Sequence, residues 1–408
     1  MGTAQDGQSV RGSLFGEHDF RLILIAWGGS MLGDSLAVVA LMLRVQGDTG
    51  SGFAVAGLLL ASGLPAVALN PLAGWIVDRF ETTRVLAIAA LFQAAAAVGL
   101  ALVDSLAATI ALAGALGCGA AVERPALFAL LPRAVGEERA PPAMGWLEAV
   151  RYGGLTLGLL FGGILTATLG ASSALLVDAG TFLLAAGCAV ALRTRRRPDR
   201  YDDGDESGRM SAGMRLLAAD PILRTSVLVL CAAVGFAAIV NVAEVFYAKD
   251  ELGAGDAGFG ALAASWGVGM SVGALTSGRW LSGANAARAV VLATLGSGVV
   301  LLLAAPAPTL VFALVCFVFG GAFNGIENVA MRVLVQARVA DHLRGRVYSA
   351  YQGGITAANF MAIAAGGAVV ELSSPRGTFA AAGIGALAAG AIGSVLFVRI
   401  ERRQPERV

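Results

Sequence analysis

A chain of 408 residues that is 57% hydrophobic and only 14% charged, with a mean hydropathy of +0.75, has too much apolar surface for one water-soluble core. Its formal net charge of +1 indicates no particular charged partner. The composition therefore excludes an ordinary soluble domain and requires a lipid bilayer.

Twelve apolar windows are each long enough for a transmembrane helix, which needs roughly 20 apolar residues. We expect an all-α membrane protein whose short connections make consecutive helices antiparallel. Residues 1–17 read as a disordered cytoplasmic tail and 401–408 as a second tail. The windows are 20–43, 52–78, 85–103, 106–132, 143–169, 172–192, 221–247, 257–282, 287–305, 309–335, 347–370 and 377–398.

The basic residues are distributed unevenly among the connections. With both termini inside, 22 of the 29 fall in cytoplasmic segments, and the outer loops keep only Arg44, Lys249 and Arg376. Positive loops are retained in the cytoplasm, so this asymmetry predicts an even number of helices with both ends cytoplasmic.

The first helix carries Trp27, Met31 and Asp34 on one face. Asp34 lies 13 residues beyond Arg21 and 10 before Arg44, which places it near the middle of the membrane. It has no basic neighbour within its own helix, so we expect proton coupling there. Trp27 and Met31 are candidates for the substrate cavity.

The connection after the second window reads Gly74-Trp-Ile-Val-Asp78-Arg79-Phe-Glu-Thr-Thr-Arg84. It resembles the Gly-x-x-x-Asp-Arg loop between the second and third helices of the major facilitator superfamily. The resemblance implies that Gly74 allows close packing on the eleventh helix, and that Asp78 is a cytoplasmic latch anion with Arg79 and Arg84 as partners. The alternative is a polar helix cap beside positive-inside arginines.

The fourth helix carries a second acid at mid-membrane depth. Glu123 precedes Arg133 by 10 residues, roughly 15 Å along a helix. Because a lone carboxylate in hydrocarbon is costly, we expect a basic partner, a cavity or protonation. Arg124 and Arg151 are the nearby bases, and Glu148 competes for Arg151 at i, i+3. Coupling and purely structural ion pairing both remain open.

The fifth helix contains Gly154-Leu-Thr-Leu-Gly158-Leu-Leu-Phe-Gly162-Gly163. This run resembles the antiporter motif of proton-linked drug exporters, except that Leu159 replaces the motif's proline. An ordinary small-residue packing face is the alternative interpretation.

The segment 193–220 is the one long polar connection, basic and then acidic. We interpret it as a cytoplasmic linker between six-helix halves at 18–192 and 221–400, in preference to a surface for nucleic acid or anionic lipid. The halves align without gaps at an offset of 204 residues, which pairs Glu123 with Glu327. Parallel six-helix repeats are how major facilitator transporters place substrate between two rocking halves.

The tenth helix places Asn324, Glu327, Asn328 and Met331 at i, i+3, i+4 and i+7. We expect this stripe to face the central cavity, with Glu327 as a further proton-coupling candidate and Asn324 and Asn328 as substrate contacts. Glu244 should lie near the outer mouth.

The sequence excludes one source of energy for transport, ATP bound by a phosphate-binding loop. A phosphate-binding loop needs a lysine of its own motif, and the only lysine, Lys249, stands between Ala248 and Asp250. An ion gradient remains, and the carboxylates must carry any proton. The four cysteines stand alone in separate windows, so we predict no metal site, no disulfide and no cofactor.

Within the superfamily, Gly33-Asp34, Arg124-Pro125 and Arg344-Gly-Arg-Val resemble the enterobactin-exporter-like group of siderophore and macrolide exporters. The resemblance implies twelve transmembrane helices in two six-helix pseudo-repeats, and export of an amphipathic small molecule in exchange for protons. We expect a monomer in a bacterial plasma membrane and no enzyme activity. Nutrient uptake and a transport-inactive membrane sensor are the alternatives.

Overall fold

The computed structural model describes residues 14–195 and 206–403, and every regular element within these ranges is helical. Eleven of the described helices are long and apolar enough to cross a membrane, or twelve if one bent pair counts as a single span. The expected all-α membrane fold is confirmed. Residues 1–13 and 404–408 of the predicted tails and residues 196–205 of the linker lie outside the described residues. Leu14–Gly16, predicted as part of the disordered tail, form a short 3-10 helix.

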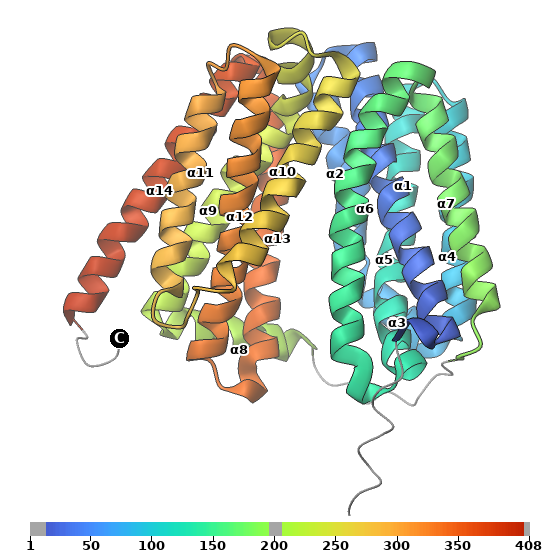
Figure 1. The fold of residues 1–408 in the computed structure, drawn as a ribbon, viewed down its shortest axis with the longest axis horizontal. Coiled ribbons are helices and arrows are strands. Elements are labelled where there is room, and N and C mark those ends of the chain that lie inside the picture. Colours follow the sequence, from blue (N-terminus) through green and yellow to red (C-terminus); the bar gives the residue numbers. More distant parts are fainter. Residues whose placement is uncertain (1–13, 196–205, 404–408) are drawn as a thin grey trace, which may run out of the picture. The chain divides into compact units, whose positions relative to one another are not determined.

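The helices follow the predicted windows closely (Figure 1). A π-helical turn, Tyr247–Glu251, extends α9. The helices are α1 His18–Thr49, α2 Gly52–Ala68, α3 Asn70–Arg79, α4 Thr82–Leu102, α5 Leu106–Val135, α6 Ala140–Leu169, α7 Ala171–Ala191, α8 Glu206–Ala219, α9 Pro221–Phe246, α10 Gly255–Ser277, α11 Ala286–Ala304, α12 Leu310–Arg338, α13 Asp341–Leu372 and α14 Pro375–Arg403.

The predicted window 52–78 consists of two helices, which together make one bent candidate span. The chain bends by 53° between α2 and the segment Leu72–Arg79. Pro71 stands in the first turn of α3 and has no N–H to donate to the preceding turn. Prolines and the break they cause explain why one apolar window gives two helices.

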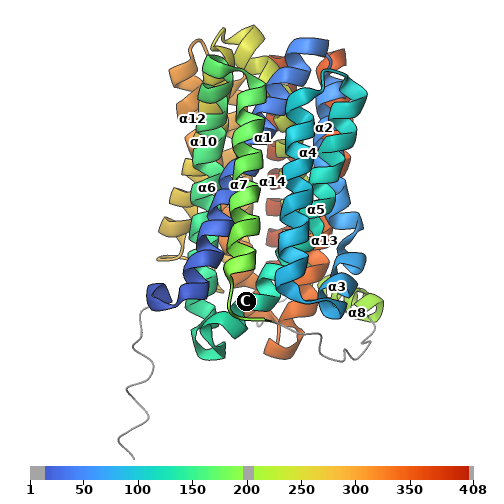
Figure 2. The ribbon, with the colours of Figure 1, turned by 90° about the vertical axis from the view of Figure 1, so that its right-hand side faces the viewer.

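The described chain forms two compact units. Unit 1 comprises Met1–Val38, Ala61–Gly158 and Leu169–Tyr201, and in it α4 packs against both α5 and α7. Figure 2 shows α4 and α7 running side by side over their length. Unit 1 therefore has a core of α4, α5 and α7 together with the first part of α1.

Unit 2 comprises Val39–Leu60, Leu159–Thr168 and Asp202–Val408. In it α12 packs against α10 and α11, and α14 packs against α9 and α11. The short helix α8 lies against α13, where a Cβ on Gly213 would collide with the Arg346 carbonyl oxygen. The predicted helical end of the linker is thus a helix packed on unit 2.

The two halves repeat the same helices at the predicted spacing. The start of each of α4, α5 and α7 is matched 204 residues later by the start of α11, α12 and α14. Equivalent pairs also pack in both halves, since α4 contacts α7 and α11 contacts α14. The pseudo-repeat is therefore structural as well as sequential.

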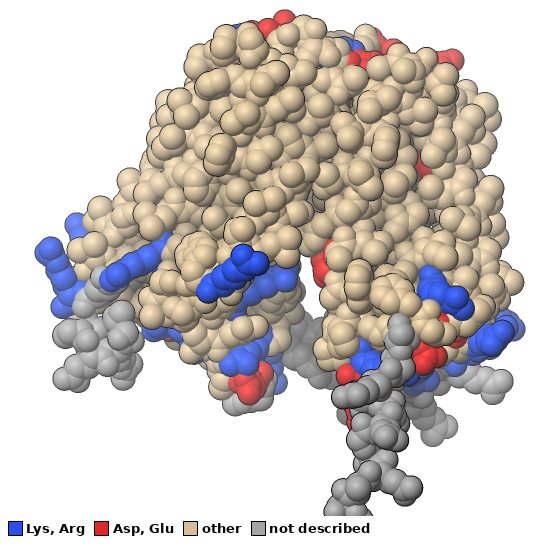
Figure 3. Space-filling model, in the orientation of Figure 1, with Lys and Arg blue, Asp and Glu red and all other residues tan. Residues whose placement is uncertain are grey.

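Large apolar side chains cover the outer faces of both units. Ile88 is 67% exposed on α4 and Leu292 is 66% exposed on α11. Such surfaces suit lipid and not water. In Figure 3 the Lys and Arg side chains of each unit gather toward one end of its helices, leaving the apolar surface between the ends nearly uncharged.

Candidate functional site

Three carboxylates come together inside unit 1, each from a different helix. Glu123 of α5 is 6% exposed and Asp178 of α7 is fully buried, while Asp34 of α1 is half-buried. The charge of Asp34 acts on both Glu123 and Asp178, and Glu123 also acts on Asp178. We call Asp34, Glu123 and Asp178 the acid cluster.

The acid cluster has few hydrogen-bond partners. Gln93 of α4 donates from Nε2 to the Glu123 carboxylate at 3.1 Å. The amide oxygen Oε1 of Gln93 and Oδ2 of Asp178 are buried and have no hydrogen-bond partner among the described residues. Buried polar atoms without partners are costly, so groups that keep them usually have a function.

A glycine brings α1 close to α7 at the cluster. A Cβ built on Gly33 would collide with Oδ1 of Asp178 and Oγ1 of Thr181. Thr181 donates its hydroxyl to the Asp178 carbonyl oxygen at 2.8 Å, which holds that side chain against α7. Gly33 therefore allows Asp178 to lie directly beside the Asp34 segment.

Asp178 is the functional candidate that the sequence analysis missed. It lies 15 residues before Arg193, which is roughly 22 Å along a helix and thus well inside the membrane. Residue counting places Asp178 at a membrane depth comparable with that of Asp34 and Glu123. The window 172–192 that contains Asp178 has no basic residue, so no ion pair draws attention to this acid.

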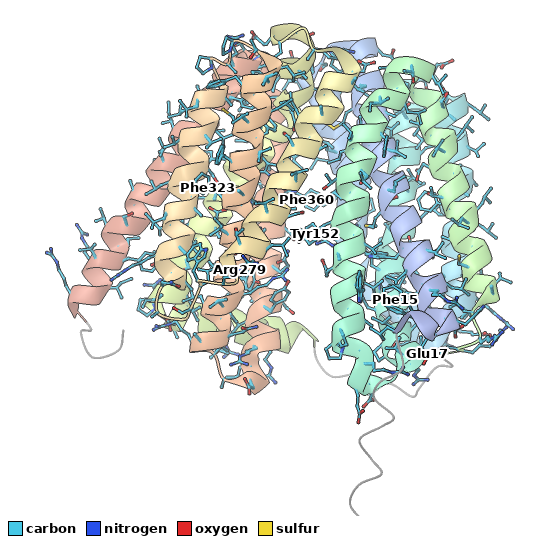
Figure 4. The ribbon with its side chains drawn as sticks, in the orientation of Figure 1. Phe15, Glu17, Tyr152, Arg279, Phe323 and Phe360 are labelled. Carbon is cyan, nitrogen blue, oxygen red and sulfur yellow. The ribbon has the colours of Figure 1, made fainter. Side chains whose placement is uncertain are left out.

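The predicted pair between Glu123 and Arg151 is wrong, because Arg151 pairs with Glu148 instead. Arg151 Nη2 lies 2.8 Å from Glu148 Oε2, one turn away on α6. The guanidinium also lies 4.1 Å from the ring centroid of Tyr152, a side chain labelled on α6 in Figure 4. Glu148 lies one turn away on the same helix, so Arg151 pairs with it and not with Glu123 on α5.

Arg124 is the basic residue whose charge acts on the acid cluster. Its side chain is exposed on α5, and its charge attracts both Asp34 and Glu123. The cluster therefore combines three acids with one base at its edge.

Unit 2 is built differently at the equivalent positions. Glu327 of α12 is 1% exposed and accepts a hydrogen bond of 2.6 Å from the Thr294 hydroxyl of α11. The residues 204 positions after Asp34 and Asp178 are Ala238 and Ala382, both 1% exposed. Glu244 of α9 is also buried and lies near the end of its helix. Its predicted place near the outer mouth stays a prediction.

The predicted polar stripe on α12 does not face one environment. Glu327 and Met331 are buried, whereas Asn328 is exposed and donates to the Asn324 carbonyl oxygen at 2.9 Å. Because α12 packs between α10 and α11, its inner face is covered by these neighbours. Asn324 and Asn328 as substrate contacts stay a prediction.

Trp27 and Met31 belong to the interior of unit 1. Trp27 is 2% exposed and its indole N–H donates to the Leu147 carbonyl oxygen at 3.1 Å. Its ring lies 6.0 Å from that of Phe128. Met31 is 8% exposed. In this structure Trp27 joins α1 to α6 and α5, and its predicted contact with substrate stays a prediction.

Several contacts of the loop motif involve Glu81. Its carboxylate accepts from Arg84 Nε at 3.0 Å and from Arg195 Nη1 at 2.5 Å. Arg79 lies over the Trp75 ring at 5.4 Å. Asp78 also takes part in an interaction, and its predicted partnership with Arg79 and Arg84 stays a prediction.

Gly74 of the loop motif is loosely surrounded. A Cβ built there would meet no heavy atom within 4 Å among the described residues. The close contact with the eleventh helix predicted for Gly74 stays a prediction. The latch role of the loop motif stays a prediction.

The glycines of the fifth-helix motif are packing positions. A Cβ on Gly158 would collide with the Leu32 carbonyl oxygen and lie 2.6 Å from Ser35 Cβ, and one on Gly154 would lie 3.1 Å from Met31 Cβ. Gly162 is buried, and Gly163 lies against Gly260 of α10 within unit 2. Small residues here let helix backbones approach closely.

Further contacts fix the ends of unit 1. Arg139 Nη1 lies 3.0 Å from Glu17 Oε1 at the start of α1, where Figure 4 labels Glu17. The Asp19 carboxylate accepts from the backbone N–H groups of Arg193 and Thr194, at 3.1 and 2.7 Å. These bonds join the beginning of α1 to the end of α7.

Metal binding has no support within the described ranges. No group of three or more His, Cys, Asp and Glu side chains there is arranged to hold a metal ion. The four cysteines are free thiols, two of them buried.

Comparison with known proteins agrees with this fold. The chain is 26% identical over 395 residues to the enterobactin exporter EntS of Shigella boydii serotype 18, covering 94% of this chain and 92% of that protein. It is 24% identical over 352 residues to YfiS of Bacillus subtilis (strain 168), an uncharacterized MFS-type transporter, with 84% of each chain covered.

Solved structures share the fold at low identity. The nucleoside transporter NupG superposes with a TM-score of 0.72 at 13% identity, covering 93% of this chain and 99% of that one. The POT family transporter PepTSo superposes with a TM-score of 0.73 at 11% identity, covering 95% of this chain and 99% of that one. The family model described as Major Facilitator Superfamily matches residues 23–247 and 225–408, so the chain belongs to the major facilitator superfamily and is a multi-pass membrane transporter.

Proposed function

We propose that this transporter exports an amphipathic small molecule from the bacterial cytoplasm by proton antiport and alternating access. Asp34, Glu123 and Glu327 are the proposed proton carriers. The protein acts as a monomer in the plasma membrane, with both termini in the cytoplasm. It needs no cofactor, and neither a metal nor nucleic acid takes part.

The observation that carries the proposal is the acid cluster of unit 1. Asp34 and Glu123 lie deep in apolar helices, and no hydrogen-bonded ion pair neutralises Glu123, whose carboxylate accepts from the neutral Gln93 amide. An intramembrane carboxylate without a close base is stable when protonated and costly when charged. A group that must gain and lose a proton as its surroundings change is what proton coupling requires.

Export is supported by the relatives named enterobactin exporters, which match along 94% of this chain. An identity of 26% is too low to assign enterobactin itself as the substrate of this chain. The amphipathic class is the coarser expectation that an apolar helix bundle with a few buried polar groups supports.

The test is efflux into inverted membrane vesicles with an imposed pH gradient, using ethidium and rhodamine as fluorescent amphipathic probes. Wild type should accumulate at least one probe only when the gradient is present. Asp34→Asn and Glu123→Gln should abolish accumulation, whereas Asp104→Asn, at an exposed position between α4 and α5, should not. Accumulation without a gradient would overturn antiport.

Two outcomes would favour other functions. Probe loss from the vesicles under the same gradient would indicate uptake in the cell. Saturable binding of a probe without any movement would indicate a membrane sensor.

A further inference from the structure

A narrow cavity lies inside unit 1, below the acid cluster. It is enclosed by α1, α4, α5 and α7, and its volume of about 20 Å³ is room for about one water molecule. Ile23, Ala26, Leu127 and Cys188 line it, and Glu123 is the charged residue in its wall. The cavity thus reaches the acid cluster at Glu123.

The cavity points along the bundle toward the end where α7 stops. Leu22 and Leu192 are lining residues nearest the beginning of α1 and the end of α7. On α7, Ala185 lines the cavity and Asp178 stands seven residues before it, on the same helical face. Asp178 therefore lies about 10 Å further along α7 than the cavity.

The first helix provides a polar step between the cavity and the upper acids. Ala26, Ser30 and Asp34 follow one another at i, i+4 and i+8 on α1. Ser30 is fully buried, and its hydroxyl lies beside the Glu123 carboxylate and interacts with it. A buried hydroxyl next to a carboxylate can accept a proton on one side and donate one on the other, so Ser30 can connect Glu123 to Asp34.

Two further buried polar atoms have no hydrogen-bond partner among the described residues. They are Oε1 of Gln93 and Oδ2 of Asp178, on residues that are 1% and 0% exposed. Gln93 belongs to α4 and Asp178 to α7, two of the helices that line the cavity. Water molecules that reach these atoms would satisfy both.

We propose that protons reach the acid cluster through the interior of unit 1, entering by the cavity at Glu123 and passing Ser30 to Asp34 and Asp178. This inference rests on the proposed proton antiport and adds Asp178 as the deepest acceptor. In each step one O–H bond forms on the acceptor as another breaks on the donor, so one carboxyl becomes a carboxylate as the next is protonated.

The charged groups that face this route are few. Asp34, Glu123 and Asp178 contribute acids from α1, α5 and α7, and Arg124 of α5 contributes the base. The α4 side of the route carries the neutral Gln93. Each proton that enters therefore reduces repulsion among three acids.

The test follows carboxyl protonation directly and needs no substrate. The full-length chain is reconstituted in liposomes, the pH on one side is stepped, and the carboxyl C=O infrared band is recorded with time. Asp178→Asn and Glu123→Gln identify the contributions of those two groups. Cys188→Phe fills the cavity, with Leu183→Phe on the exposed face of α7 as its control. Ser30→Ala removes the intermediate hydroxyl, with Ser35→Ala as its control, because Ser35 already donates to the Met31 carbonyl oxygen.

We expect Cys188→Phe and Ser30→Ala to slow the Asp178 signal by about tenfold or more, since each breaks a link of the route. Both control variants should respond like wild type. An unchanged rate in folded Ser30→Ala and Cys188→Phe would overturn the route. Proton antiport itself would fail separately, if vesicles accumulate probe without a gradient while the infrared response stays intact.

Discussion

The two halves of the chain share their helices but differ in buried charge. Unit 1 gathers Asp34, Glu123 and Asp178 in one interior, with Arg124 at the edge. Unit 2 keeps the equivalent Glu327, bonded to the Thr294 hydroxyl, and has alanines at the other two positions. The fold therefore does not require these acids. A repeat that folds with Ala238 and Ala382 indicates that Asp34 and Asp178 are kept for a function, and we place proton binding chiefly in unit 1.

The largest expected effect is on coupled transport. Asp178→Asn should lower gradient-driven probe accumulation by at least about tenfold, as expected when a positioned proton acceptor is lost. Glu327→Gln should lower it less, because Glu327 has a satisfied hydrogen bond and no acidic neighbour at the equivalent positions. Initial rates in inverted vesicles measure both, normalised to the amount of folded protein. A larger loss in Glu327→Gln than in Asp178→Asn would reverse the comparison.

Copying the missing acid into unit 2 should be harmful. Ala382→Asp would bury a carboxylate on α14 without the glycine and threonine that accommodate Asp178, at a cost of about 3–5 kcal/mol if it stays charged and unpaired. Thermal unfolding in detergent measures the loss. Ala382→Leu adds comparable volume without charge and should cost less. Equal stability of Ala382→Asp and wild type would mean that unit 2 can accept a cluster of its own.

The glycine contact between α1 and α6 should matter for stability within unit 1. Gly158→Val would force its side chain into the Leu32 backbone and cost about 1–3 kcal/mol or more. Gly153→Val is the matched control, because a Cβ at Gly153 meets no heavy atom within 4 Å among the described residues. Similar unfolding temperatures for the two variants would contradict the packing role.

The smallest expected effect concerns the pH dependence of Glu81. Hydrogen bonds from Arg195 and Thr83, together with the nearby Arg84 charge, hold the pKa of the Glu81 carboxyl below its ordinary value of 4.5. A group with a depressed folded-state pKa stabilises the fold above the unfolded pKa, and this contribution is lost as pH falls through the folded pKa. Glu81→Gln should therefore lower stability slightly at pH 7 and flatten its decline below about pH 4.5. Thermal unfolding across pH 3–7 measures this effect. If Glu81→Gln and wild type show the same pH profile, solvent screens the interactions of Glu81 with Arg195 and Arg84 completely.

Much of the fold was accessible from sequence because the bilayer imposes a simple rule. Apolar windows of sufficient length became helices, and the 204-residue offset located equivalent helices in both halves. The bend near Pro71 was the exception, since window length alone does not register a missing N–H donor.

The site was predicted only in part, for a physical reason. Depth along a helix follows from residue counting, so Asp34, Glu123 and Glu327 were found. Partners depend on how each helix is rotated about its axis, which counting does not give. Arg151 therefore turned out to pair with Glu148, and Asp178 was recognised only once Gly33 was seen to bring α1 and α7 together.

The most direct test of proton binding in unit 1 drives proton movement with a gradient of the probe in place of a pH gradient. Proteoliposomes with a pH-sensitive dye in the lumen receive an ethidium or rhodamine gradient and no pH gradient. Wild type should move protons against the direction of probe movement, Glu327→Gln should retain much of this signal, and the triple variant Asp34→Asn, Glu123→Gln, Asp178→Asn should show none. Proton movement that persists in the folded triple variant would contradict the assignment of proton binding to unit 1.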